Sequence, residues 1–224
     1  MRTKALLLAA AVMAVGAGTS MAQVYSANAV GYVNLSLPAG FSIIANPLNN
    51  TNNSLNTLLP TAPNQTIAYR FNPATMQYQS STRVAIGWTP NLVFDPGEGF
   101  FIRLAAPLNV TFVGEVPQGN LSNPLVGGNA FQLKSSQVPQ ALPLGRPQAV
   151  NPTLGFPAAV GDRVWLYANP PGQYVSYNFQ SGLNAWLGQN NNGGDGPTIA
   201  VATGFFLQKT GAAVQSWNRT FSVN

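Results

Sequence analysis

A stretch near the middle of the chain is echoed at its end. The run GFFIRL at 99–104 corresponds to GFFLQK at 204–209, and VTFVGEV at 110–116 corresponds to WNRTFSV at 217–223. Its spacing of roughly one hundred residues exceeds the roughly 20 to 50 residues of solenoid repeats. The echo therefore predicts one β-rich unit written twice; the alternative is a chance resemblance between aromatic-rich strands.

Matched aromatic residues extend the echo upstream. Four pairs follow the same order in both halves: Tyr69 with Trp165, Tyr78 with Tyr174, Trp88 with Trp186, and Phe100 with Phe205. The spacing within the pairs grows along the chain, as expected when insertions collect in loops between strands. We predict a first β module at 23–117, a linker at 118–128 and a second module at 129–224, which could also pack as one pseudo-symmetric domain.

The distribution of glycine and proline indicates an all-β fold. The chain has 22 Gly and 18 Pro placed between short apolar runs, which leaves room for strands and turns but not for long helices. Strands are expected at 29–37 and 41–45, with at most one helical turn around 55–59. The fold class predicted is an antiparallel sandwich or barrel built from two tandem modules of roughly 90 residues.

Two hairpins are predicted at equivalent places. Strands at 67–71 and 76–80 flank the turn Asn72-Pro73-Ala74-Thr75, and strands at 164–168 and 173–179 flank Asn169-Pro170-Pro171-Gly172. An Asn-Pro start suits a tight loop, because Asn bonds to the following backbone and Pro fixes its own backbone angle.

The first 22 residues read as a secretory signal peptide. Arg2 and Lys4 precede an uncharged apolar core at 5–15, and Ser20-Met21-Ala22 has the small residues of a cleavage site. The core falls short of the roughly 20 residues that span a bilayer, and no later stretch approaches that length. We expect a mature chain from Gln23, secreted or held at the cell surface, without a transmembrane span.

The composition excludes several kinds of chemistry. Only 7% of residues are charged, and Cys and His are absent. Without imidazole or thiol the chain has no catalytic triad, no cysteine nucleophile and no ordinary zinc site, so no metal centre or cofactor is expected. The scattered Lys and Arg form no basic stripe, which argues against nucleic acid as a partner.

The acids offer two weaker possibilities. Asp95 and Glu98 could in principle act as the carboxylate pair of a glycosidase. The run Asp95-Pro96-Gly97-Glu98 is more typical of a type II turn, and 200–203 in the second module has no acids. The oxygen-rich loop at 189–196 contains a single acid, Asp195, and a flexible turn is favoured there over a weak calcium site.

Aromatic side chains are the candidate ligand-binding residues. Trp88, Trp186, Tyr78 and Tyr174 could present flat faces to a polysaccharide, although an aromatic that recurs once per module more often fills a core. Self-association is the other possibility, because the strands at 99–104 and 110–113 are nearly uncharged and lack the charges that protect sheet edges. A homo-oligomer joined through sheet edges is therefore possible.

Motifs at 29–33, 40–48, 97–101 and 217–223 resemble a group of secreted two-copy proteins associated with verrucomicrobial genomes. The resemblance implies secretion and β structure and carries over no site residues. The leading hypothesis is a secreted, non-enzymatic β protein that acts through its surface, most simply as a structural subunit outside the cell. A carbohydrate-binding module is the alternative, and a carboxylate glycosidase comes third.

Overall fold

The computed structural model describes residues 29–188, 191–211 and 214–223, so the predicted signal peptide lies outside the described residues. The described chain is all-β, with several antiparallel sheets and one short helix, α2 (Leu55–Leu58). No sheet among these residues closes on itself, so the barrel alternative is wrong. The single helical turn around 55–59 is confirmed.

The first half of the chain, residues 29–117, forms a five-stranded sheet and a two-stranded ribbon. The sheet order is β2-β6-β3-β4-β5, and the ribbon pairs β1 with β7. The strands are β1 (Val30–Leu37), β2 (Gly40–Ala45), β3 (Ile67–Asn72), β4 (Gln77–Val84), β5 (Gly87–Thr89), β6 (Gly99–Leu104) and β7 (Leu108–Glu115).

The second half, residues 118–223, forms a six-stranded sheet, a second ribbon and one short pair of strands. The sheet order is β14-β13-β12-β11-β16-β9, the ribbon pairs β8 with β17, and β10 pairs with β15. The strands are β8 (Gly119–Leu125), β9 (Phe131–Lys134), β10 (Leu142–Pro143), β11 (Arg163–Ala168), β12 (Gln173–Gln180), β13 (Ala185–Gly188), β14 (Asn191–Gly194), β15 (Thr198–Ile199), β16 (Phe205–Gln208) and β17 (Gln215–Phe221).

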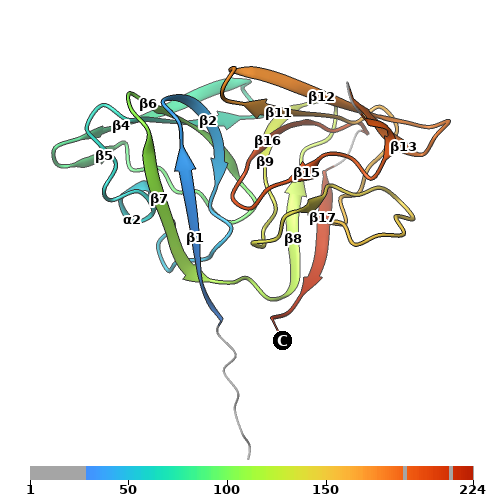
Figure 1. The fold of residues 1–224 in the computed structure, drawn as a ribbon, viewed down its shortest axis with the longest axis horizontal. Coiled ribbons are helices and arrows are strands. Elements are labelled where there is room, and N and C mark those ends of the chain that lie inside the picture. The colour runs from blue at the N-terminus through green and yellow to red at the C-terminus, as the bar shows by residue number, and fades with distance from the viewer. Residues whose placement is uncertain (1–28, 189–190, 212–213, 224) are drawn as a thin grey trace, which may run out of the picture.

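The strand order is the same in the two sheets apart from β14. The order β2, β6, β3, β4, β5 has its counterpart in β9, β16, β11, β12, β13, and Figure 1 shows the two sheets side by side with a ribbon below each. The registers agree as well, since Tyr69 lies opposite Phe101 and Trp165 lies opposite Phe206. Both predicted hairpins, β3–β4 and β11–β12, are confirmed.

The segment 118–128, predicted to be a linker, contains strand β8. This strand pairs along its whole length with β17, near the end of the chain. Gly119 and Pro124 made the segment look like a linker, because both residues usually interrupt strands. A two-stranded ribbon tolerates proline, since a strand with one partner has a side on which no amide hydrogen is needed.

Each half has its own hydrophobic core. In the first half the rings of Phe94 and Phe100 stack with centroids 4.1 Å apart, and α2 packs Leu55 into the same cluster. In the second half Trp186 and Trp217 both pack against Phe156. Trp217 is 3% exposed.

The two halves meet through matched positions. A backbone bridge joins Ile44 to Thr203, and its counterpart joins Lys134 to Glu98. Gly99 and Gly204 face each other so closely that a Cβ added to Gly204 would lie 3.1 Å from the Gly99 Cα. These contacts join the two halves at Ile44, Gly99, Lys134 and the 203–204 segment.

The predicted type II turn at 95–98 is confirmed. The Glu98 amide donates to the Asp95 carbonyl at 3.0 Å, and Gly97 has φ +97°. A type II turn needs a positive φ at its third position, which glycine adopts without strain. The equivalent turn in the second half places Ala202 there at φ +59°.

Candidate functional site

The side-chain alternation of β3 and β11 places aromatic rings on the outer side of both sheets. Ala68 and Val164 are fully buried in the cores, so the residues that follow them point the other way. The rings on this side form what we name the aromatic face: Phe41, Tyr69, Phe71, Tyr78 and Phe101 from the first half, and Phe131, Trp165, Tyr167, Tyr174 and Phe206 from the second.

Ring contacts connect the aromatic face across the junction between the halves. The centroid of Phe206 lies 5.5 Å from that of Phe71, and the matched pair, Phe101 and Tyr167, is separated by 5.8 Å. Phe101 and Phe206 also meet each other, with centroids 5.9 Å apart. Such edge-to-face and tilted pairs stabilise one another and hold the rings in defined orientations. The face is therefore continuous over both sheets.

Two grooves lie on the aromatic face, each with a volume of about 360 Å³. The first groove is lined by Phe41, Tyr69, Tyr78, Phe101, Tyr167 and Tyr174. The second groove is lined by Phe71, Met76, Phe131, Trp165, Tyr174 and Phe206. Most lining residues of one groove are the matched counterparts of those of the other, and Tyr174 belongs to both. Within the described part of the chain, no charged side chain lines either groove.

The exposed tyrosines of the grooves remain neutral phenols near neutral pH. Tyr78 is 48% exposed and Tyr174 is 46% exposed, so each offers a ring to solvent. Partial burial raises the pKa of Tyr78 above its ordinary value. Burial, with smaller contributions from Tyr78 and Tyr167, raises the pKa of Tyr174 to about 12. Their hydroxyl groups can thus both donate and accept hydrogen bonds.

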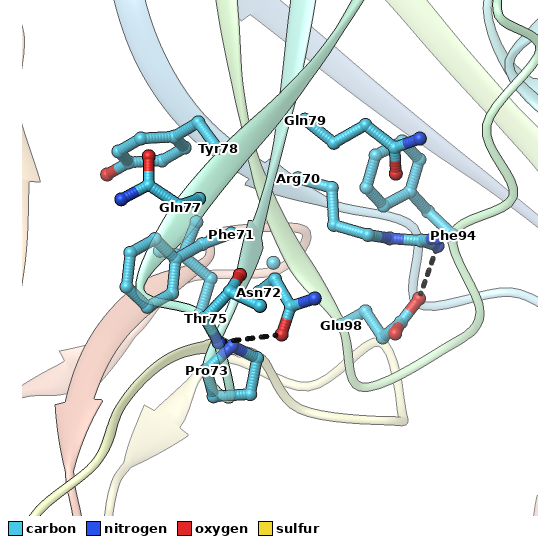
Figure 2. A pocket seen from close by; sticks show the side chains of 12 residues that line it. Arg70, Phe71, Asn72, Pro73, Thr75, Gln77, Tyr78, Gln79, Phe94 and Glu98 are labelled. Carbon is cyan, nitrogen blue, oxygen red and sulfur yellow. Dashed lines mark hydrogen bonds and ion pairs between the residues drawn. The ribbon is translucent and has the colours of Figure 1, made fainter.

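A polar pocket adjoins the grooves at the β3–β4 hairpin, with a volume of about 520 Å³. Figure 2 shows Arg70 and Glu98 joined on one side of the hairpin, with Phe71 and Tyr78 on the other. Arg70 Nη2 donates to Glu98 Oε2 at 3.3 Å, and the guanidinium lies 4.8 Å from the ring centroid of Phe94. The pocket contacts both grooves, because Phe71 and Tyr78 also line them.

The carboxylates at 95–98 have structural partners. Glu98 Oε2 also accepts the amide hydrogen of Asp95 at 3.1 Å, and Asp95 Oδ1 accepts from Asn53 Nδ2 at 2.9 Å. Lys134, bridged to Glu98 through the backbone, has a pKa that burial lowers and that the Glu98 carboxylate partly restores. These contacts stabilise the turn, and nothing in them favours the glycosidase hypothesis.

The structure separates the four predicted ligand-binding residues into two groups. Tyr78 and Tyr174 lie on the aromatic face. Trp88 is 3% exposed and Trp186 is 0% exposed, and their indole nitrogens donate to the carbonyls of Leu59 and Gly145. The expectation that these two tryptophans could offer a face to a sugar is wrong, and the core alternative is confirmed.

Trp165 is the residue that the sequence analysis missed. It lies half-buried in the second groove, with its ring centroid 5.3 Å from that of Phe131. The available signal was the pair of aromatic residues two positions apart, Trp165 and Tyr167, matching Tyr69 and Phe71. Residues two apart in a strand share a face, and two aromatic pairs mark the same face of both hairpins.

No metal centre or membrane helix is found in the described part of the chain. Its Asp and Glu residues form no cluster of three or more that could hold an ion. The oxygen-rich loop at 189–196 lies partly outside the described residues, and Asp195 accepts from Arg146 Nε at 2.7 Å. None of the described residues form a helix with the length and apolar character that a membrane crossing requires.

Comparison with known proteins gives no relative: no family model, no curated protein and no solved structure matches this chain. The function must therefore be argued from the geometry of the aromatic face and the polar pocket.

Proposed function

We propose that this protein is a secreted, non-enzymatic binding protein whose aromatic face holds an uncharged glycan chain. The observation that carries the proposal is the pair of adjacent aromatic grooves lined by no charged residue, with half-exposed Tyr78 in the first groove and half-exposed Tyr174 shared by both. A sugar ring has an apolar face of C–H groups that stacks on an aromatic ring, while phenol hydroxyls bond to its hydroxyls. A charged polymer would have no counter-charge in these grooves.

A polymer of identical sugar units can occupy two equivalent binding sites at once. We propose that the chain consists of two copies of one module, which the equal strand orders, equal registers and reciprocal junction contacts support. Two equivalent grooves next to each other then offer two equivalent stacking sites to successive units of one polymer. The proposal of export rests on residues 1–22 of the sequence.

Tryptophan fluorescence tests this proposal directly. Of the tryptophans at 88, 165, 186 and 217, only Trp165 lines a groove, and the other three are buried. Neutral cello-, xylo- and chito-oligosaccharides are expected to shift its emission, and Trp165→Phe should remove the shift. Tyr174→Ala should weaken binding about tenfold or more, because one stacked ring contributes about 1–3 kcal/mol.

The matched control is Tyr32→Ala, which removes an exposed tyrosine of β1 outside the aromatic face. It should bind the same oligosaccharides with unchanged affinity. Wild-type protein that shows neither an emission shift nor heat of binding with any of the three series would contradict the proposal.

Assembly through β1 is a second candidate function, favoured by one observation. Among the described strands β1 pairs only with β7; it carries no charge and exposes 60% of Val30 and 70% of Tyr32. The inner edges of the large sheets are less accessible, since Ala45 donates to Ala202 and Ser135 donates to Gly97 across the junction. We propose that a second copy adds to β1 as an antiparallel strand.

Analytical ultracentrifugation tests this second candidate. Wild-type protein should associate as its concentration rises, and Tyr32→Lys should keep it monomeric, since an exposed charge discourages strand addition. Tyr78→Lys, a matched charge on the aromatic face, should leave the association unchanged. A wild-type protein that remains monomeric at every concentration would rule out assembly through β1.

A further inference from the structure

The polar pocket makes the two halves different. Its ion pair, Arg70 with Glu98, belongs to the first half, and the matched positions in the second half are Leu166 and Thr203. The two aromatic grooves are near copies of each other, and the polar pocket touches both of them, through Phe71 and Tyr78 of the first-half hairpin. Among the described residues, the pocket beside Trp165 in the second half contains Arg163 but no acidic partner. The surface of the molecule therefore has a chemically distinct end.

The Arg70 guanidinium is held in place and still has donors to offer. Its Cζ lies 4.8 Å from the ring centroid of Phe94, a fully buried residue, and one of its hydrogens goes to Glu98. Its Nε is shielded from water and has no hydrogen-bond partner among the described residues. A buried donor without a partner costs free energy, so a ligand oxygen that reached this part of the pocket would gain more than at an exposed arginine.

The Glu98 carboxylate supplies acceptors next to these donors. The amide of Asp95 and the guanidinium of Arg70 orient the carboxylate, and the side chain remains 42% exposed. Where an arginine lies beside a carboxylate, the guanidinium can donate to one hydroxyl oxygen of a sugar and the carboxylate can accept the hydrogen of the adjacent hydroxyl. The four charged side chains around the pocket have no net charge, because Arg70 and Lys134 are basic and Asp95 and Glu98 are acidic. A carboxylate on the ligand would meet Glu98 as a like charge.

We infer that the polar pocket is a specificity subsite for two adjacent hydroxyl groups of a neutral sugar unit, which gives the glycan chain one direction on the aromatic face. This inference rests on the proposed function. Stacking on the aromatic face supplies affinity in either direction, because the two grooves are equivalent. The hydroxyl contacts to Arg70 and Glu98 favour the direction that brings a suitable sugar unit to the hairpin.

The test compares two variants by calorimetry with the neutral oligosaccharide that binds wild-type protein and with an acidic oligosaccharide of the same length built from uronic acids. Arg70→Leu combined with Glu98→Thr places the residues of the second half in the pocket. Its affinity for the neutral oligosaccharide should fall about tenfold, because charge-assisted hydrogen bonds are lost. The Trp165 emission shift at saturation should remain, since stacking continues.

Glu98→Gln is the milder variant and keeps the shape of the side chain. It should bind the acidic oligosaccharide more tightly than wild-type protein does, because the like charge is gone. Arg83→Leu, which removes an arginine of β4 that lines neither groove nor the polar pocket, is the control and should change neither affinity.

The outcomes separate the two proposals. If the double variant binds the neutral oligosaccharide as wild-type protein does while Tyr174→Ala binds weakly, the subsite is refuted and the aromatic-face proposal stands. If the double variant is misfolded by circular dichroism, Glu98→Gln decides: an unchanged preference between the neutral and acidic oligosaccharides refutes the subsite. Wild-type protein that binds no glycan overturns both proposals.

Discussion

Replacement of Asp162 with Asn is expected to lower the free energy of unfolding by about 3–5 kcal/mol, because it leaves a buried ammonium group without its counter-ion. Asp162 and Lys209 are both 0% exposed, and the Lys209 Nζ donates to Asp162 Oδ2 at 2.5 Å. The other acceptor of the Lys209 ammonium is the carbonyl of Pro157, at 2.8 Å, which carries no charge. Urea unfolding followed by circular dichroism measures the loss.

The opposite substitution, Lys209→Met, should cost less than Asp162→Asn. The carboxylate would keep three donors: the amide of Ala159, and the amide and hydroxyl of Thr210. Hydrogen bonds to backbone and hydroxyl groups solvate a buried carboxylate in place of the ammonium. Equal costs for the two substitutions would show that these three donors contribute little.

The first half of the chain offers the matched control. Thr66 and Leu104 occupy the places of Asp162 and Lys209, and the equivalence is structural. The backbone amide of Arg83 donates to the Thr66 carbonyl at 2.9 Å, and the backbone amide of Phe179 donates to the Asp162 carbonyl at the same distance. The double variant Asp162→Thr with Lys209→Leu should be more stable than either single variant, because uncharged replacements of a buried ion pair are often nearly neutral. A double variant no more stable than Asp162→Asn would contradict this account.

The second large effect is expected at Trp186. Trp186→Ala should lower the free energy of unfolding by about 3–5 kcal/mol, because it removes a fully buried ring from the core of the second half. The ring packs against Phe156 and Phe179, and its indole N–H donates to the Gly145 carbonyl at 2.6 Å. The substitution also leaves that carbonyl without this donor. Thermal and urea unfolding both report the loss.

The comparison variant is Tyr174→Ala, which truncates a half-exposed ring of the aromatic face. Tyr174→Ala should lower the free energy of unfolding less than Trp186→Ala does, because the Tyr174 ring is only half-buried. It should lower the affinity for the glycan more, because Tyr174 lines the grooves and Trp186 lies in the core. Trp186→Phe, which preserves most of the ring volume, should recover much of the loss. If Trp186→Ala left stability intact and abolished glycan binding, the structural role assigned to this tryptophan would be wrong.

Local chemistry in the sequence was sufficient to place most strands and turns. The Asn-Pro turns located both hairpins, and the Pro-Gly pair located the type II turn at 95–98. Each of these turns depends on only a few consecutive residues, so it can be predicted without knowing how the rest of the chain folds. Strand β8 was missed because its partner β17 lies at the other end of the second half, and no local signal encodes that pairing.

The sequence by itself determined the all-β architecture, the hairpins and the absence of imidazole and thiol chemistry. Only the tertiary structure decided which aromatic rings are buried and which are available. Alternation in a strand defines two faces, but which face is covered depends on the elements that pack against it. Trp88 and Trp186 lie in the cores, whereas Trp165 lies on the outer side of its sheet, because each core covers only one face of a sheet.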